Sequence, residues 1–284
     1  MGNALRNEGK LEKAIAAFKK ACSLEPNLAE TYNNLGVALK DQGKFEEAME
    51  VYNKVISLKP DYADVYNNIG ITLKDQGKLG KAIKAFEKAI SLKPDHAESY
   101  YNMGIAFQDQ SKIYEAIEAY NKAISIKPDF SRAFFNMGIA LKGATLTRPN
   151  KVLQNTITQL LEKKVYVKPS DISHAAISLL KLDPILEKHL RFTDGGMVKE
   201  PLNVISDLNK LPLLLKLMRV CPLADQELEK LFKNLRAWLL STILALKELP
   251  SELIGFQSAL ALQCFTNEYV YSETKNEEKN LLAY

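Results

Sequence analysis

The sequence predicts an all-α protein, a solenoid of helical hairpins followed by a non-repeating helical domain. Three observations support this fold class. The 34-residue segment Ala63–His96 recurs without insertions at Ala29–Tyr62 and Ala97–Phe130. Each copy contains two runs of apolar residues at helical spacing, separated by turn residues. The period is lost after Lys142, although the helical patterns continue. A fixed period of this length is typical of a stacked array, in which each unit buries its apolar face against its neighbours.

Each copy is predicted to be a helix–turn–helix hairpin. In Ala63–His96, Gly77 stands where the first helix would end in a left-handed turn. Pro94 closes the second helix, because proline cannot continue one. The small residues Gly70 and Ala82 are expected on the two helix faces that must meet. Ser111 replaces the turn glycine in the next copy, so we expect that turn to be more costly.

The spacing Tyr-x-x-Ile-Gly-x-x-Leu, then Ala-x-x-x-Phe-x-x-Ala and a closing Pro, resembles the tetratricopeptide repeat. This resemblance implies a repeat array that binds other proteins. The first copy lacks the start of its first helix, so we expect the chain to be an incomplete piece of a longer protein; a genuine short start is the alternative. The expected array covers 1–142, with partial copies at 1–28 and 131–142 and full copies at 29–62, 63–96 and 97–130.

Residues 143–284 are predicted to form a separate helical domain. Two of its segments, Lys168–Pro184 and Phe256–Tyr271, resemble the helical region that precedes a class I S-adenosylmethionine-dependent methyltransferase domain in some bacterial tetratricopeptide proteins. The resemblance implies that the chain ends short of that further domain, so no catalytic or cofactor-binding residue is assigned. Helices are expected at 150–163, 172–182, 184–191, 201–208, 211–220 and 224–246, and from Ser251 to Phe265.

Composition narrows the partners that the chain is expected to bind. Lysine and arginine total 38 against 34 acidic residues, and no clustered basic footprint for nucleic acid is present in the sequence. Cys22, Cys221 and Cys264 are widely spaced, which favours reduced thiols in a cytoplasmic protein over a disulfide framework. The apolar run Ala237–Leu246 is too short to span a bilayer and is interpreted as a buried helix. We therefore expect a protein partner, without nucleic acid or membrane; the oligomeric state stays open.

Residues that could carry catalysis or bind a metal are scattered in the sequence. His96, His174 and His189 lack the spacing of a metal site. His96 is interpreted as a solvated residue of an inter-repeat loop, and the other two as hydrogen-bonded structural residues. No nucleophile elbow or phosphate-binding loop is present in the sequence, so we expect no catalytic residue, cofactor or metal.

The face of each first helix opposite its core stripe is the predicted binding surface. At about 100° per residue, this face carries an asparagine in every copy, whose amide can pair with a peptide backbone. In tetratricopeptide superhelices this face lines the concave groove, and the asparagines resemble the ladder in the repeat arm of O-linked N-acetylglucosamine transferases. The alternative is that they are solvated repeat consensus. The predicted groove residues are Asn34, Asn68, Asn102 and Asn136, then Val37, Ile71, Ile105 and Ile139, with Tyr101, Phe135, Asp41, Asp75 and Asp109 at its flanks beside Glu30, Asp64 and Glu98.

Two functions follow from this sequence. The preferred one is an interaction scaffold that binds an extended, possibly basic, peptide or protein segment in the groove, without catalysis in this chain. The alternative is the substrate-recognition arm of a larger transferase, with a methyltransferase favoured over an O-GlcNAc-type glycosyltransferase.

Overall fold

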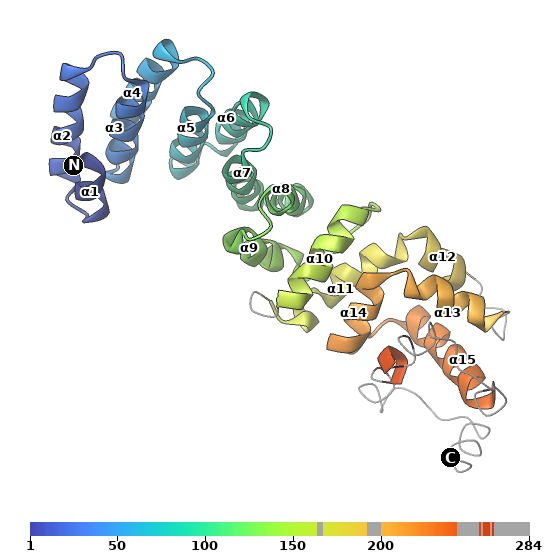
Figure 1. Cartoon of the computed structure of the whole chain (residues 1–284). Helices are drawn as coiled ribbons and strands as arrows, with labels where there is room; N and C mark the ends of the chain where they lie inside the picture. The colour runs from blue at the N-terminus through green and yellow to red at the C-terminus, as the bar shows by residue number, and fades with distance from the viewer. Residues whose placement is uncertain (164–166, 192–199, 243–255, 257, 262, 264–284) are drawn as a thin grey trace. The chain divides into compact units, whose positions relative to one another are not determined.

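The computed structural model describes residues 1–163, 167–191, 200–242, 256, 258–261 and 263 (Figure 1). Within these ranges every regular element is a helix, which confirms the predicted all-α fold. The chain divides into two compact units, Met1–Met137 and Gly138–Tyr284. The division lies inside helix α9, and the domain boundary expected after Lys142 remains a prediction.

The first unit is a series of helical hairpins that follow the sequence period. Consecutive helices pair, and each hairpin contacts the next one along the chain. Figure 1 shows α1, α3, α5 and α7 on the inner side of an arc, with α2, α4, α6 and α8 on its outer side. The helices are α1 Gly2–Asn7, α2 Leu11–Leu24, α3 Ala29–Asp41, α4 Phe45–Leu58, α5 Ala63–Asp75, α6 Leu79–Leu92, α7 Ala97–Asp109, α8 Ile113–Ile126 and α9 Ser131–Leu141.

Glycine allows the two helices of a hairpin to approach closely. A Cβ atom added at Gly70 would lie 2.4 Å from Cε1 of Phe86, a clash that leaves no room for a side chain. Ala82, on the facing helix, is fully buried. Gly77 has φ +73° in the turn, and Ser111 adopts φ 60° at the same place in the next copy. The predicted roles of these residues are confirmed, and the non-glycine turn occupies a conformation that L-residues adopt less readily.

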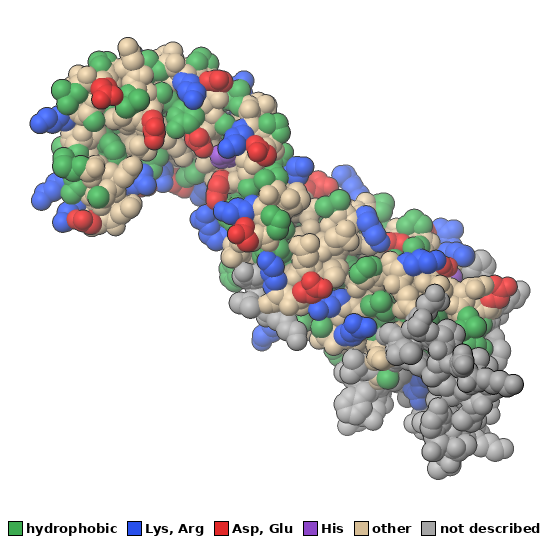
Figure 2. All heavy atoms as spheres, viewed as in Figure 1, with side chains coloured by type: hydrophobic (Ala, Val, Ile, Leu, Met, Phe, Trp, Pro, Cys, Tyr) green, Lys and Arg blue, Asp and Glu red, His purple; other side chains and the backbone are tan. Residues whose placement is uncertain are grey.

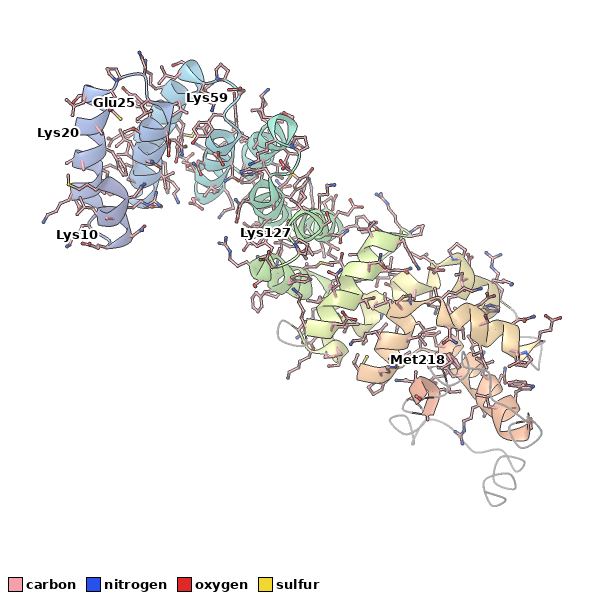
Figure 3. The ribbon with its side chains drawn as sticks, in the orientation of Figure 1. Lys10, Lys20, Glu25, Lys59, Lys127 and Met218 are labelled. Carbon is pink, nitrogen blue, oxygen red and sulfur yellow. The ribbon has the colours of Figure 1, made fainter. Side chains whose placement is uncertain are left out.

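Contacts between a turn lysine and an aromatic ring also recur in the array. The Lys59 ammonium lies 5.0 Å from the centre of the Tyr62 ring, and the Lys127 ammonium lies at the same distance from the centre of the Phe130 ring. Figure 3 labels the two lysines. Each lysine directly follows the last residue of an outer helix. These two cation–π contacts are copies of one local structure.

The second unit is built from helices without a repeat. Asn150 Oδ1 accepts a hydrogen bond from the Leu153 N–H at 2.9 Å and thereby caps the first of them. The next helix starts at Pro169, earlier than predicted, because proline is well tolerated in a first turn. The helices are α10 Lys151–Lys163, α11 Pro169–Lys181, α12 Pro184–Leu190, α13 Pro201–Asn209, α14 Pro212–Val220 and α15 Gln226–Thr242.

A leucine-rich core holds the second unit together. Helix α14 packs against both α10 and α11, and its Leu217 and Met218 are buried. On α15, the apolar residues Leu228, Phe232 and Leu235 are buried as well. Among the described helices, none combines the length and the apolar character needed to cross a bilayer. The end of the predicted helix 224–246, most of the helix expected from Ser251 to Phe265, and Cys264 lie outside the described residues.

Candidate functional site

The inner helices place the predicted binding residues on one face of the array. Residues 30, 34, 37 and 41 lie on one side of α3, since their spacing follows the helical repeat. Equivalent residues occupy α5 and α7 in the same register. The space-filling view shows the array curving around an open hollow (Figure 2). We call the surface formed by these residues, together with Phe135 and Asn136 of α9, the inner face.

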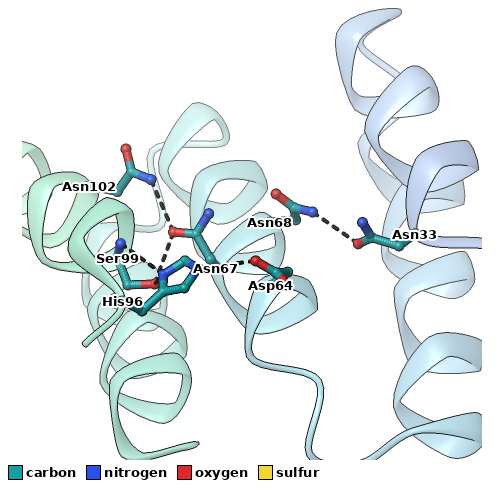
Figure 4. A network of polar contacts seen from close by, with 7 residues as sticks. All are labelled: Asn33, Asp64, Asn67, Asn68, His96, Ser99 and Asn102. Atoms are coloured by element: carbon teal, nitrogen blue, oxygen red, sulfur yellow. Dashed lines mark hydrogen bonds and ion pairs between the residues drawn. The ribbon is translucent and has the colours of Figure 1, made fainter. Parts of the chain in front are cut away.

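Two asparagines of the inner face, Asn68 and Asn102, are hydrogen-bonded to the preceding repeat (Figure 4). Asn68 Nδ2 donates to Asn33 Oδ1 at 2.9 Å. One repeat later, Asn102 Nδ2 donates to Asn67 Oδ1 at 3.0 Å. Asn33 and Asn67 are buried, whereas Asn68 and Asn102 are half-buried. These side chains therefore join adjacent repeats, a role that the sequence analysis did not assign to them.

The sequence analysis missed the two acceptors of these hydrogen bonds, Asn33 and Asn67. Each lies directly before a predicted groove asparagine and 35 residues before its donor. The available signal was the doubled asparagine in the Tyr-Asn-Asn segments at 32–34 and 66–68. Helical periodicity cannot pair residues on different helices, so this signal gives no partner by itself.

A third hydrogen bond between adjacent repeats has an aromatic residue as its acceptor. Asn136 Nδ2 donates to the Tyr101 hydroxyl at 3.2 Å. Tyr101 is expected from the sequence at the edge of the groove, but it is only 8% exposed. Its ring packs 5.0 Å from Phe130 and 6.0 Å from Tyr120, measured between ring centres. Tyr101 therefore occupies the acceptor position between two repeats and offers little surface to a ligand.

The prediction that His96 is solvated is wrong. Its side chain is 9% exposed and caps α7, where Nδ1 accepts the Ser99 N–H at 3.2 Å. The other ring nitrogen, Nε2, lies 3.1 Å from Asp64 Oδ1 of the preceding repeat. Ser99 Oγ donates to Asn67 Oδ1 at 3.2 Å (Figure 4). His96 thus connects the cap of α7 to the preceding repeat.

The apolar side chains of the inner helices are half-buried on α3, α5 and α7 and more exposed on α9. Val37 and Ile71 are half-buried and pack against the core. Ile105 is also half-buried. On α9, Phe135 and Ile139 are 51% and 49% exposed. The most accessible apolar surface of the inner face therefore lies on its last helix.

Two of the three predicted flanking aspartates carry a partner from the neighbouring residue. Asp41 Oδ1 lies 2.8 Å from Lys40 Nζ, and Asp75 Oδ1 lies 2.9 Å from Lys74 Nζ. Asp109 has no ion-pair partner among the described residues. The flank of the inner face therefore carries less negative charge than the sequence suggests, because lysine side chains neutralise two of its three aspartates.

The acidic residues in the first turn of each inner helix also differ in whether they have a partner. Glu98 pairs with Arg132 of the following repeat at 3.4 Å, and Asp64 faces the His96 ring. Glu30 has no ion-pair partner within the described part of the chain. Among the acids of the inner face, Glu30 on α3 and Asp109 on α7 are thus the two that neither pair with a lysine or arginine nor face a histidine ring within the described residues.

A histidine–carboxylate pair in the second unit connects two of its helices. Asp207 accepts hydrogen bonds from Lys210 at 2.9 Å and faces His189 Nε2 at 3.0 Å. The bond from the Lys210 ammonium, followed by that from His189, lowers the pKa of Asp207 to about 2. His189 is buried, so this pair links α12 to α13, in agreement with its predicted structural role.

The remaining reactive groups that the structure describes are not gathered into a site. Burial raises the pKa of the Cys22 thiol, and it raises that of Cys221 to about 11, so both thiols are poor nucleophiles. His174 Nε2 lies 2.9 Å from the Thr145 hydroxyl at the surface. In the ranges that the structure covers, no three His, Cys, Asp or Glu side chains are grouped so that they could hold a metal ion.

Comparison with known families identifies the repeated unit. A TPR repeat family model matches residues 2–43, 38–77 and 72–111, and a tetratricopeptide repeat model matches 97–130. Comparison with curated protein sequences finds no match. The O-GlcNAc transferase and methyltransferase resemblances are not shown by these comparisons.

The solved structures to which this chain is similar include MamA, YrrB and PilF. MamA is 33% identical over 58% of this chain and 94% of its own, with a TM-score of 0.47. YrrB, described as a TPR protein with an unusual peptide-binding site, is 20% identical over 64% and 89%, with a TM-score of 0.41. PilF of Pseudomonas aeruginosa is 19% identical over 90% and 93%, with a TM-score of 0.46. With all three scores below 0.5, the assignment rests on the family models and on the hairpin geometry: residues 2–130 of this chain form a tetratricopeptide-repeat array. Tetratricopeptide-repeat proteins are protein-interaction scaffolds.

Proposed function

We propose that the inner face binds an extended segment of another protein, without catalysis in this chain. The row of asparagines is the observation that carries this proposal. The bond to the preceding repeat uses one N–H of Asn68 and one of Asn102. Each side chain keeps its Oδ1 and a second N–H, which can pair with the N–H and C=O of a peptide backbone. Because the bond already orients each amide, little rotamer entropy remains to be lost on binding.

Charge supports a modest preference for basic segments. The carboxylates of Glu30 and Asp109 have no cationic partner among the described residues, whereas Asp41 and Asp75 are paired. We therefore expect lysine or arginine in the segment to strengthen binding near these two positions. Because the groups are at the surface, salt should weaken the preference. Bacterial origin and a cytoplasmic location belong to this proposal as well.

Peptide binding by the full chain tests the proposal. The probes are synthetic glycine–serine peptides of equal length that carry lysines, glutamates or neither, titrated at low and high salt. The double substitution Asn68→Ala/Asn102→Ala should weaken binding of the lysine peptide roughly ten- to a hundredfold. Each lost hydrogen bond contributes about 0.5–1.5 kcal/mol, and about 1.4 kcal/mol corresponds to a factor of ten.

Two further variants separate binding from folding. Asn53→Ala, at an exposed position of the outer helix α4, should bind as the parent does. Asn33→Ala/Asn67→Ala removes the acceptors but keeps the groove amides, so it should destabilise the array by about 1–2 kcal/mol and weaken binding less than the groove pair. If the parent and the Asn68→Ala/Asn102→Ala variant are both folded and bind the peptide equally well, the proposal is wrong. The two asparagines would then only form hydrogen bonds between repeats.

A second candidate function uses the same surface as the substrate-recognition arm of a larger transferase. The asparagines resemble the ladder of O-linked N-acetylglucosamine transferases, and the segments Lys168–Pro184 and Phe256–Tyr271 resemble the helical region that precedes a methyltransferase domain. The two segments favour a methyltransferase over a glycosyltransferase. The reading frame downstream of Tyr284 tests it, since a strand followed by a glycine-rich turn would indicate the methyltransferase. In either case, calorimetric titration of this chain with S-adenosylmethionine should give no saturable heat.

A further inference from the structure

We infer that the outer helices of the array form a second binding surface, whose partner is a second copy of this chain. We call this surface the outer face; it consists of the exposed sides of α2, α4, α6 and α8, which all belong to the first unit. The outer helices lie on the opposite side of the arc from the inner helices (Figure 1). The inference is therefore independent of the segment proposed to bind the inner face.

The sign of the exposed charge alternates from one outer helix to the next. Lysine predominates on α2 and α6, whereas glutamate predominates on α4 and α8. Positions 13, 47, 81 and 115, which are equivalent in the repeat, hold Lys, Glu, Lys and Glu in turn. The exposed charged residues are Glu12, Lys13, Lys19 and Lys20 on α2, Glu46, Glu47, Glu50 and Lys54 on α4, Lys81, Lys84, Glu87 and Lys88 on α6, and Glu115, Glu118 and Lys122 on α8.

A surface with this alternation is complementary to itself when it is turned by 180°. With a two-fold axis between α4 and α6, helix α4 of one copy meets α6 of the other, and α2 meets α8. Each of these contacts joins a mainly acidic helix to a mainly basic one. Two-fold contacts are the commonest in homo-oligomers, and they require a patch that complements itself. The outer face meets this requirement, which a uniformly acidic or basic face would not.

The charges at the centre of the outer face are not used up within one chain. Glu47 lies 4.0 Å from Lys19 of the preceding outer helix and 3.9 Å from Lys44. In contrast, Glu50 on α4 and both Lys81 and Lys84 on α6 are exposed, and none of these three has an ion-pair partner among the described residues. Charge of both signs is therefore available on α4 and α6, where the two-fold axis would lie.

A glycine on α6 gives the outer face room for a facing helix. Gly80 is exposed, and the equivalent residues are Glu46 on α4 and Tyr114 on α8. Nothing lies within 4 Å of a Cβ atom added at Gly80, so packing inside the chain does not require glycine there. The missing side chain allows the N-terminal half of α4 from a second copy to approach closely. In this antiparallel arrangement Glu47 and Glu50 lie opposite Lys84 and Lys81 of the other copy.

The association of the full chain in solution tests this inference. In sedimentation velocity at low salt, we expect a monomer that is converted to a dimer as the protein concentration rises. High salt should shift the equilibrium back toward the monomer, because it screens charges at the surface. A parent chain that stays monomeric at every accessible concentration in low salt overturns the inference, and so does a dimer that is insensitive to salt.

Two charge-reversal variants distinguish the proposed contact from any other dimer. Glu47→Lys/Glu50→Lys makes α4 basic, and Lys81→Glu/Lys84→Glu makes α6 acidic. Each variant alone should self-associate at least about tenfold more weakly than the parent, because like charges then face each other. A mixture of the two should regain the affinity of the parent. In the mixed dimer, the basic α4 of the first variant meets the acidic α6 of the second, and the other contact keeps its original charges.

The mixture also separates this contact from effects within one chain, because mixing cannot relieve repulsion between neighbouring helices of the same molecule. Asp61→Lys/Asp95→Lys, in exposed turns between repeats, changes the net charge as much as Glu47→Lys/Glu50→Lys does. This control should dimerise as the parent does. Circular dichroism checks that each variant is folded, and the single substitutions Glu50→Lys and Lys84→Glu replace any double variant that is not.

The remaining outcomes decide between the contact and its alternatives. Gly80→Leu should weaken the dimer and leave the helical content unchanged, because its side chain enters the contact. If the reversal variants lose association and their mixture does not recover it, or if the turn control loses association as well, the proposed contact is wrong. Peptide binding by the inner face is measured separately, so these results leave the proposed function as it stands.

Discussion

The two units of this protein are built from the same element but use their buried polar side chains differently. In the repeat array, Asn33 and Asn67 accept hydrogen bonds from the next repeat at equivalent positions. In the helical unit, Asp183 caps α12, and Gln263 bonds backbone groups around the end of α14. The first kind of contact recurs with the period, whereas each contact of the second kind occurs at one place.

This difference explains why the proposed binding surface lies on the array. Residues that recur in register create a continuous row of amides and apolar side chains along one face of the array. The polar groups of the helical unit are used at helix ends and loops, so they leave no comparable row among the described residues. Repetition gives the array a surface with regular spacing, which suits an extended ligand whose own backbone groups are regularly spaced.

The position of the single tryptophan allows the two units to be followed separately. Trp238 lies on α15, so its fluorescence reports on the helical unit, while hydrogen exchange resolves the array helices. The following predictions use the full chain with both measurements.

The largest effect is expected in the helical unit. Gln263 Nε2 donates to the Met218 and Cys221 carbonyls, both at 2.7 Å, and Oε1 accepts the Leu223 N–H at 3.0 Å. Gln263→Met leaves these buried backbone groups without that partner, at about 1–3 kcal/mol for each unsatisfied group. We expect a loss of about 3 kcal/mol in the Trp238 unfolding transition. Gln159→Met, at an exposed position of α10, is the control and should change little; an equally small change at Gln263 would contradict this prediction.

A smaller effect is expected from overpacking one hairpin of the array. Gly70→Leu pushes a side chain into the Phe86 ring and should destabilise the array by about 1–3 kcal/mol, measured as reduced hydrogen-exchange protection of α5 and α6. Gly80→Leu is the matched control, because nothing lies within 4 Å of a Cβ added at Gly80. Equal protection in the two variants would mean that the hairpin relaxes around the added side chain. A shift of the Trp238 transition in Gly70→Leu would show that the two units unfold together.

The smallest effect depends on pH and belongs to the helical unit. The pKa of Asp207 is lowered from 3.8 to about 2 in the folded chain. Its carboxylate therefore stabilises the fold above the unfolded pKa, and this stabilisation is lost as pH falls toward 2. Because the group is partly solvated, we expect less than about 1 kcal/mol. Asp207→Asn should be less stable than the parent near pH 5, with the difference shrinking on acidification in Trp238-monitored unfolding. A difference that is constant with pH would assign the effect to packing instead of charge.

Much of the array could be predicted from sequence, because its determinants are local. The spacing of Gly70, Gly77 and Ala82 places small residues at the helix contact and a left-handed residue at the turn, and the structure confirms both. The inner-face asparagines could be placed on their helix by periodicity alone. Their inter-repeat partners could not be placed in this way, nor could the ion pairs of Asp41 and Asp75, which depend on side-chain rotamers.

The sequence by itself determined the hairpin, its period and the face that each residue occupies, because these follow from the helical repeat within a single unit. Only the tertiary structure decided that Asn68 and Asn102 bond to the preceding repeat, that His96 and Tyr101 are buried, and that Phe135 is open. These outcomes depend on how far each hairpin is rotated against the next one. That rotation brings together residues about 35 positions apart, and the period of the sequence does not encode it.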